Sequence, residues 1–183
     1  MSVSSSICNF GEKSHDFSLQ STDGKLVNLN DVKGENGYLI TFICNHCPYV
    51  KAIIKFLVND VMYLENIGVK SVAIMSNDTQ KYPEDSFENM KKFAKKNNFS
   101  FPYLYDASQQ VAKKYEAICT PDFFGYNKNS ELQYRGRILD ARKLEPTHTG
   151  ETELRKAMKA IAANGKGPEE QIASIGCSIK WVK

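Results

Sequence analysis

The sequence lacks the features that would place it in a membrane or on nucleic acid. It has no apolar run near the ~20 residues that a membrane-spanning helix needs. Residues 1–10 contain neither the basic nor the apolar region of a secretory signal. The net charge of +3 arises from lysines spread along the chain and is too small to indicate a nucleic-acid partner. We therefore expect a cytoplasmic protein that binds neither membranes nor nucleic acids.

The sequence also lacks the cysteine pattern of a secreted, disulfide-stapled protein. Its five cysteines are an odd number, and a reducing compartment does not favour a structural disulfide framework. Reactive or metal-binding thiols are then the alternatives. We assign no role to Cys8, in a terminal segment expected to fray, and expect Cys177 to anchor the tail by packing. Cys44, Cys47 and Cys119 are left as candidates for chemistry.

The remaining composition is that of an ordinary soluble protein. With 183 residues, 42% hydrophobic and 25% charged, the chain can bury a core without disulfides. No internal repeat or low-complexity segment divides it. We expect a single domain over residues 1–183, with an irregular tail from about residue 164.

Hydrophobic periodicity predicts strands and helices in alternation. Asp23-Gly24 predicts the turn of an N-terminal hairpin, and the apolar run 38–43 is typical of a strand buried on both faces. Helical spacing then runs from Pro48 to about residue 66. The later elements are expected as a buried strand at 69–75, a helix at 86–97, an extended piece at 102–105, a short helix at 111–117, a hairpin of 122–126 with 132–138, and a closing helix at 151–163.

This order of elements predicts the fold class. A strand, a helix and a strand in succession imply a right-handed parallel crossover, and the second hairpin adds antiparallel strands. We expect an α/β protein with a mixed central sheet flanked by helices and extended by the N-terminal hairpin. Ligands bind beyond the carboxyl ends of parallel strands in such sheets. The first buried strand ends at Ile43, which brings Cys44 to that edge.

The segment Cys44-Asn45-His46-Cys47-Pro48 stands at this strand-to-helix junction. Proline is favoured at the first position of a helix, which makes Cys47 the N-cap. Free backbone N–H groups and the helix dipole stabilise a thiolate there, and such cysteines have pKa values of ~3.5–7.5. The thiolate is the nucleophile in both thiol exchange and peroxide reduction. The sequence therefore predicts a redox-active Cys47, with His46 as a nearby source of positive charge.

Thr120-Pro121 is a second signal, because a proline that begins a strand needs no N–H. X–Pro bonds are cis in only ~5–6% of folded cases, so the residues alone do not predict a cis bond. Cys119 comes just before this pair and is read equally well as a core cysteine or as a redox thiol.

Other functions are compatible with the same cysteines. One C-x-x-C with an adjacent histidine lacks the second ligand pair of a structural zinc site. A zinc or copper carrier would therefore need Cys44 and Cys47 together with a distant histidine such as His148. A non-catalytic redox sensor or interaction module would have an unshifted pKa at Cys47 and would consume no peroxide.

Several stretches together resemble one family. Residues 16–31 are similar to an N-terminal hairpin added to a thioredoxin core, and residues 42–50 to an active-site segment. Residues 120–124 are similar to a cis-proline loop, and 134–137 to the strand that follows the second hairpin turn. With the ending at 176–181, they identify the chain as resembling the peroxiredoxin-like branch of the thioredoxin superfamily. This branch is also called alkyl hydroperoxide reductase/thiol-specific antioxidant (AhpC/TSA), or redoxin.

The resemblance, which runs from about residue 11 to 161, implies a thioredoxin fold, a cis bond before Pro121 and Cys47 as the nucleophile. The resolving position of thioredoxins falls on Val50, which has no thiol. Cys44 and Cys119 are then equal candidates for the resolving thiol, and Cys119 would come beside Cys47 if Pro121 is cis. Cys177, for which packing is favoured over chemistry, is left open as a third candidate.

The chain departs from the peroxiredoxin pattern at the positions seven and three residues before Cys47. Peroxiredoxins carry Pro and Thr or Ser there, whereas this chain has Ile40 and Cys44. Their peroxide-binding arginine has Arg142 as its only weak counterpart. The extra hairpin favours a peroxide substrate, whereas the missing hydroxyl favours a disulfide.

We therefore expect an oxidoreductase with antioxidant character that reduces peroxides or protein disulfides through Cys47. Its catalytic residues are expected to be Cys47, Cys44, Cys119, Thr120 and Pro121. A thioredoxin- or glutathione-type protein or thiol would reduce it, and no cofactor is expected.

Overall fold

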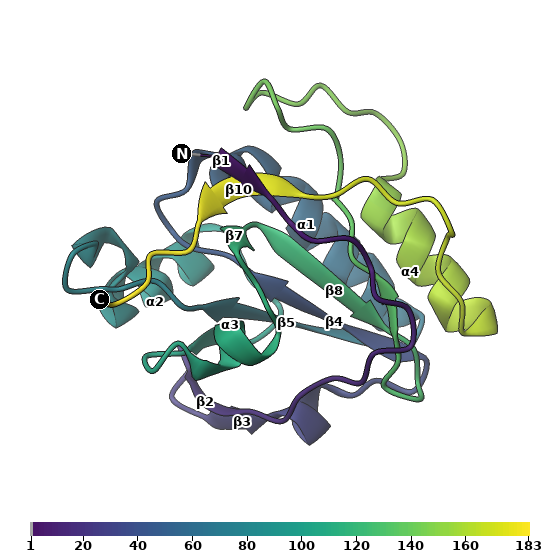
Figure 1. The fold of residues 1–183 in the computed structure, drawn as a ribbon, viewed down its shortest axis with the longest axis horizontal. Helices are drawn as coiled ribbons and strands as arrows, with labels where there is room; N and C mark the ends of the chain where they lie inside the picture. Colours follow the sequence, from purple (N-terminus) through teal and green to yellow (C-terminus); the bar gives the residue numbers. More distant parts are fainter. Residues whose placement is uncertain (1) are drawn as a thin grey trace.

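A seven-stranded mixed sheet forms the centre of the computed structural model, which describes residues 2–183 (Figure 1). The strand order is β3-β2-β6-β5-β4-β8-β9, with β4 parallel to β5 and antiparallel to β8. The strands are β2 (Ser18–Ser21), β3 (Leu26–Asn28), β4 (Gly37–Phe42), β5 (Val69–Met75), β6 (Tyr103–Tyr105), β8 (Asp122–Tyr126) and β9 (Leu132–Tyr134). The helices are α1 (Pro48–Asn66), α2 (Phe87–Lys96), α3 (Gln110–Lys114) and α4 (Glu153–Asn164), with 3-10 turns at Leu29–Val32 and Pro83–Asp85.

This topology confirms the predicted α/β class and thioredoxin fold. The core unit β4-α1-β5 is followed by the antiparallel pair β8-β9 and by α4, and the strands of this unit lie in the order β5-β4-β8-β9. The N-terminal hairpin β2-β3 turns at Asp23-Gly24, as predicted, and joins the sheet through β6. No helix among residues 2–183 is long and apolar enough to cross a membrane.

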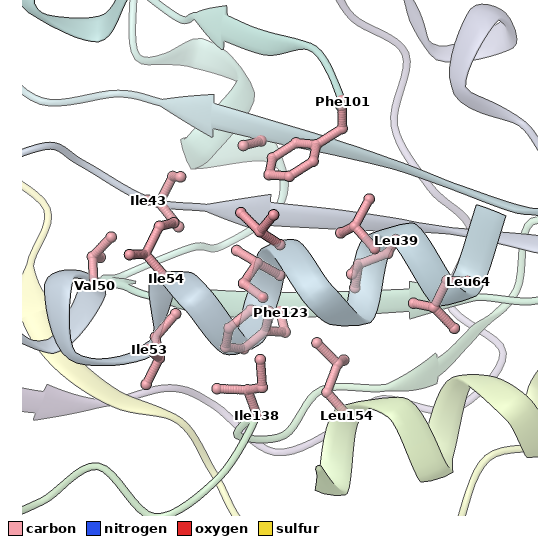
Figure 2. Packing of buried hydrophobic residues seen from close by; sticks show 14 of the residues in the cluster. Leu39, Ile43, Val50, Ile53, Ile54, Leu64, Phe101, Phe123, Ile138 and Leu154 are labelled. Carbon is pink, nitrogen blue, oxygen red and sulfur yellow. The ribbon is translucent and has the colours of Figure 1, made fainter. Parts of the chain in front are cut away.

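Two hydrophobic clusters lie on opposite faces of the sheet, because β4 is buried on both faces. Leu39 and Ile43 contribute to the cluster under α1 and α4, whereas Ile40 and Phe42 contribute to the cluster under α3. Figure 2 shows the first cluster, in which residues of α1 pack over β4. The core thus fixes β4 and α1 rigidly, and the active-site candidates lie on the short loop between them.

The tail differs from the irregular segment expected. It contains β10 (Ile175–Ser178), which pairs antiparallel with β7 (Cys119–Thr120) on one side and with β1 (Ser2–Ser4) on the other. Figure 1 shows these strands as a second, small sheet next to α1. A four-residue strand that contains glycine has no readable alternation, and its backbone pairing to a distant loop leaves no local sequence signal.

The second hairpin is also shorter than expected, since β9 ends at Tyr134 and does not reach residue 138. A side chain at Gly136 would come within 2.7 Å of the Tyr134 ring, so the chain turns back over its own strand there. The short helix after β6 is likewise reduced to α3.

Candidate active site

Cys47 lies at the junction of β4 and α1, as the N-cap of α1 with Pro48 at the first helical position. Its side chain is fully buried, and the sulfur lies 3.1 Å from the carbonyl oxygen of Thr120. The helix begins here because Pro48 fixes the first turn and an apolar stripe from Val50 onward packs into the core. The loop before Cys47 is also held by contacts to Thr120 and Asp85.

The Cys47 thiol is acidic. Its pKa is lowered from 9.0 to about 5, chiefly by a hydrogen bond from the Cys44 thiol. Burial opposes this shift, whereas the backbone N–H of Val50 and the thiol and N–H of Cys177 reinforce it. A thiol with this pKa is a thiolate at neutral pH, which is the nucleophilic form of cysteine.

Cys44 has the opposite character. It is fully buried, with its sulfur 3.4 Å from Thr120 Oγ1 and 4.0 Å from His46 Nδ1. Its hydrogen bond to Cys47, its burial and the charge of Asp85 raise its pKa well above the usual value. Cys44 is therefore the protonated partner that donates to the Cys47 thiolate, in the position where peroxiredoxins carry a hydroxyl.

The loop before β8 brings the third side of the site. The Thr120-Pro121 bond is cis, as the resemblance implied. Thr120 meets Cys47 through its carbonyl oxygen and Cys44 through its hydroxyl, so a single residue contacts both thiols. The structure thus brings Cys44, Cys47 and Thr120 together from segments more than 70 residues apart in sequence.

Cys119 lies beside this cluster without joining its hydrogen bonds. It is buried, and its thiol lies 3.6 Å from the Pro121 carbonyl oxygen. Burial and the neighbouring charge of Asp122 raise the pKa of this thiol far above its usual range. Its role as a resolving thiol stays a prediction.

Asp85 is a part of the site that the sequence did not predict. Its Oδ1 accepts the backbone N–H groups of Asn45 (2.8 Å) and His46 (3.2 Å). Its Oδ2 accepts from Asn77 (2.7 Å) and lies 2.7 Å from His46 Nδ1. This fully buried carboxylate fixes the backbone of the Cys44–Cys47 loop. Asp85 stands in a polar linker, and nothing in its local sequence distinguishes it from a solvated acid.

The same groups decide whether the site suits a metal. Among residues 2–183, Cys44, His46 and Asp85 form a group whose ligand atoms lie within 4.8 Å of one another. Both Asp85 oxygens already accept two hydrogen bonds each, and a metal would have to displace some of them. His148, the distant histidine of the metal-carrier hypothesis, instead stacks edge-on against Phe56. The donor set is therefore better suited to orienting the loop.

Arg142, the weak counterpart of a peroxide-binding arginine, is exposed and paired with Asp140. The other arginines are also committed to carboxylates: Arg135 to Asp122, Arg137 to Glu153 and Arg155 to Asp60. All four arginines of the chain are thus paired with carboxylates, whereas a peroxide-binding arginine needs a free guanidinium.

Cys177 is the second unpredicted neighbour. It is half-buried in β10, directly opposite Thr120 in the strand pairing, and packs against the cluster that contains Cys44 and Cys47. The sequence indicated a packed anchor in the tail, which describes its packing but not its location. Only the strand pairing with Thr120 in the cis-proline loop reveals that Cys177 lies next to Cys47.

Comparisons with known proteins agree with this picture. The model of the AhpC/TSA family matches residues 10–139. The thiol-disulfide oxidoreductase ResA of Bacillus subtilis (strain 168) is 25% identical over 122 residues, which cover 67% of this chain and 64% of that protein. The match therefore spans less than two thirds of that relative's length.

Two solved structures are similar over nearly their whole length. An uncharacterized conserved protein from Geobacillus kaustophilus is 43% identical, with a TM-score of 0.91 over 100% of this chain and 97% of that one. A hypothetical protein from Sinorhizobium meliloti 1021 is 39% identical, with a TM-score of 0.90 over 98% and 97%. The family model covers well over half of the chain, and the protein therefore belongs to the AhpC/TSA family.

Proposed function

We propose that the protein is a thiol oxidoreductase in which the Cys47 thiolate attacks an oxidised substrate. The observation that carries this proposal is the position of Cys47 at the N-cap of α1, where its pKa is lowered to about 5. A buried cysteine that only fills space has the opposite shift, as Cys119 shows, because burial disfavours the charged thiolate. A module that only binds other proteins has no need of an acidic thiol.

A disulfide is the substrate that the local chemistry favours. Cys47 attacks one sulfur of the disulfide, the S–S bond breaks, and the departing thiolate takes up a proton. The name of the relative ResA, thiol-disulfide oxidoreductase, supports this choice. So does the presence of a thiol at Cys44, where a peroxide-orienting hydroxyl is expected, and the commitment of the arginines to carboxylates.

Peroxide reduction is the second candidate, because Cys47 is fully buried and a small oxidant reaches a buried thiolate more easily than a protein does. In that reaction the thiolate attacks a peroxide oxygen, the O–O bond breaks, and the products are a sulfenic acid and an alcohol or water. Membership of the AhpC/TSA family supports this candidate. In either case we propose a thioredoxin- or glutathione-type thiol in a reducing compartment such as the cytoplasm as the reductant.

Turnover with each oxidant tests the proposal. Purified protein is given dithiothreitol as reductant and either oxidised glutathione or hydrogen peroxide as substrate. Cys47→Ser should abolish both activities, whereas Cys8→Ser should leave them unchanged, since Cys8 packs near Arg135 and Gln171, apart from the Cys44–Cys47 site. A higher rate with the disulfide supports the first candidate, and a higher rate with peroxide supports the second. Equal rates for wild type and Cys47→Ser would refute both.

A further inference from the structure

Cys177, in the C-terminal strand β10, lies next to Cys47, and the reaction described above does not use its thiol. Hydrogen bonding from the thiol and the backbone N–H of Cys177 is among the causes that lower the pKa of Cys47. The contact is built into the fold: Cys177 pairs with Thr120 in the small sheet, and the Thr120 carbonyl oxygen lies 3.1 Å from Cys47 Sγ. β10 also packs against α1, the helix that Cys47 begins.

The strand that carries Cys177 fits flush against the cis-proline loop. A Cβ atom at Gly176 would overlap the carbonyl group of Thr120 and come within 3.0 Å of the Pro121 nitrogen. Only glycine allows this approach at residue 176. The close fit places the next residue, Cys177, over the N-terminus of α1.

Both ends of this strand are anchored. Ser174 is buried and donates its hydroxyl to the Pro121 carbonyl oxygen at 2.7 Å. At the other end, the Lys180 N–H donates to Asn77 Oδ1, and the Lys180 carbonyl accepts from Asp78 N–H, both at 2.8 Å. Asn77 also donates to Asp85, so the tail and the Cys44–Cys47 loop share a hydrogen-bonded chain.

Accessibility separates the two thiols that contact Cys47. Cys44 is fully buried like Cys47, so a disulfide between them would be less accessible to an external thiolate than one that includes a half-buried sulfur. Thiol–disulfide exchange requires attack on one of the two sulfurs and therefore access to it. Cys177 is half-buried, and a disulfide to it would bring one sulfur to the surface.

We propose that Cys177 is the resolving thiol and that oxidation of the site ends in a Cys47–Cys177 disulfide. The proposal rests on the proposed function of Cys47. After attack on a disulfide R–S–S–R′, Cys47 carries an S–S–R bond and R′–SH has left. The Cys177 thiol loses its proton and attacks the Cys47 sulfur, the S–S–R bond breaks, and R–SH leaves with that proton. The substrate gains two electrons from the two cysteines and two protons, one from the Cys177 thiol and one from solvent, because Cys47 reacts as the thiolate.

With a hydroperoxide as oxidant, the same thiol condenses with the Cys47 sulfenic acid. The S–S bond forms and water leaves, which balances the reaction. An external dithiol of the thioredoxin type then reduces the disulfide by attacking the exposed Cys177 sulfur. Cys44 keeps its proton throughout and acts as the hydrogen-bond donor to Cys47.

Peptide mapping of the oxidised protein tests this assignment. Reduced protein receives one equivalent of cystamine or of hydrogen peroxide, free thiols are alkylated, and disulfide-linked peptides are identified by mass spectrometry. We expect a Cys47–Cys177 linkage in wild type and in the matched control Cys8→Ser. Cys177→Ser should accumulate the mixed disulfide with cystamine, and the dimedone adduct of Cys47 with peroxide.

Other products overturn the assignment in distinguishable ways. A Cys44–Cys47 or Cys47–Cys119 linkage with Cys177 free would show that another thiol resolves. Oxidised Cys47 without any intramolecular disulfide would show that no thiol of the chain resolves. In both cases the proposed function of Cys47 survives, whereas an unmodified Cys47 with both oxidants would refute that function as well. The wild-type map needs no variant, so misfolding of Cys177→Ser does not affect it.

Discussion

At the scale of single residues, the proposed nucleophile and its hydrogen-bond donor are two thiols whose pKa values are shifted in opposite directions. Cys44 loses its proton far less readily than Cys47, because the one hydrogen bond between them stabilises a single thiolate. The charge of Asp85 reinforces this division by raising the pKa of Cys44 further. The C-x-x-C spacing therefore places a low-pKa thiol, Cys47, at the helix N-terminus and a protonated thiol, Cys44, as its hydrogen-bond donor.

The pH dependence of Cys47 alkylation checks this division of roles. The rate with iodoacetamide should fall as pH drops through the pKa of about 5, because the thiolate becomes protonated, and should be flat at neutral pH. Cys44→Ala removes the largest cause of the low pKa and should move the midpoint upward, whereas Cys44→Ser keeps a donor and should restore much of it. A wild-type midpoint near 9 would contradict the assignment.

A second prediction at this scale concerns Asp85. Asp85→Ala leaves the buried N–H groups of Asn45 and His46 without an acceptor, which costs about 1–3 kcal/mol for an unsatisfied group. Urea unfolding should show this loss of stability, and the rate of Cys47 alkylation should change because the Cys44–Cys47 loop is no longer held in place. The adjacent exposed residue gives the control, because Glu84→Ala should change neither quantity. Equal stability of the two variants would show that Asp85 does not hold the loop.

What the sequence predicts at this scale follows from how local the signal is. Cys47 is predictable because its strand, its proline and its helix are consecutive. Asp85 and Cys177 are not, since each comes from a segment 38 or more residues away in sequence. Each meets backbone groups that any residue type provides: Asp85 accepts the N–H of Asn45, and Cys177 pairs with the strand at Thr120. The residues alone drew attention to Thr120-Pro121, whereas its cis bond was expected only from the resemblance.

At the scale of elements, a buried ion pair fixes β8 to β9 directly after the cis-proline loop. Asp122 is fully buried, and its Oδ2 lies 3.1 Å from Arg135. Arg135 also donates to the Glu116 carbonyl oxygen and lies 4.5 Å over the Phe124 ring. The pair therefore connects the loop that touches Cys47 to the far edge of the sheet.

Breaking this pair should destabilise the protein strongly. Arg135→Leu leaves the Asp122 carboxylate buried without a counterion, which costs about 3–5 kcal/mol. The double variant Asp122→Asn/Arg135→Leu should recover part of the loss in urea unfolding. Arg142→Leu is the control, because its exposed pair with Asp140 should contribute at most about 1 kcal/mol. A double variant less stable than Arg135→Leu would contradict this account.

The same pair gives a pH dependence with a definite sign. Burial raises the pKa of Asp122 from 3.8 to about 6, even beside Arg135. The folded state therefore binds this proton more tightly than the unfolded state does, and the contribution of Asp122 to stability falls as pH rises from about 4 through 6. Urea unfolding of wild type and Asp122→Asn over this range should show the fall only in wild type. A parallel response of the two proteins would contradict it.

At the scale of the whole molecule, a strand from the N-terminal segment and a strand from the C-terminal segment pair with each other next to the candidate active site. β1 pairs with β10, and β10 with β7, so that the N-terminal and C-terminal segments form one small sheet beside α1 (Figure 1). The unit β4-α1-β5 at the centre of the fold was predictable, because its elements are long and its hydrophobic patterns are clear. The small sheet was not predictable, because its strands have two to four residues and are strands only by pairing with one another.

β10 can be displaced from Cys47 by a substitution that leaves every cysteine in place. Gly176→Val places a side chain against the Thr120 carbonyl, so β10 must move away from β7. Alkylation of Cys47 by a bulky maleimide should then accelerate, and the yield of the Cys47–Cys177 disulfide should fall. The neighbouring change Ile175→Val, at a half-exposed position of the same strand, should alter neither quantity. Hydrogen exchange should quicken over residues 174–180 in Gly176→Val while β4 and α1 stay protected, because the fully buried residues of the core beneath them belong to other elements and Cys177 only packs against that core. If alkylation of Cys47 were unchanged although exchange in β10 quickened, the buried state of Cys47 would be due to the cis-proline loop and not to the tail.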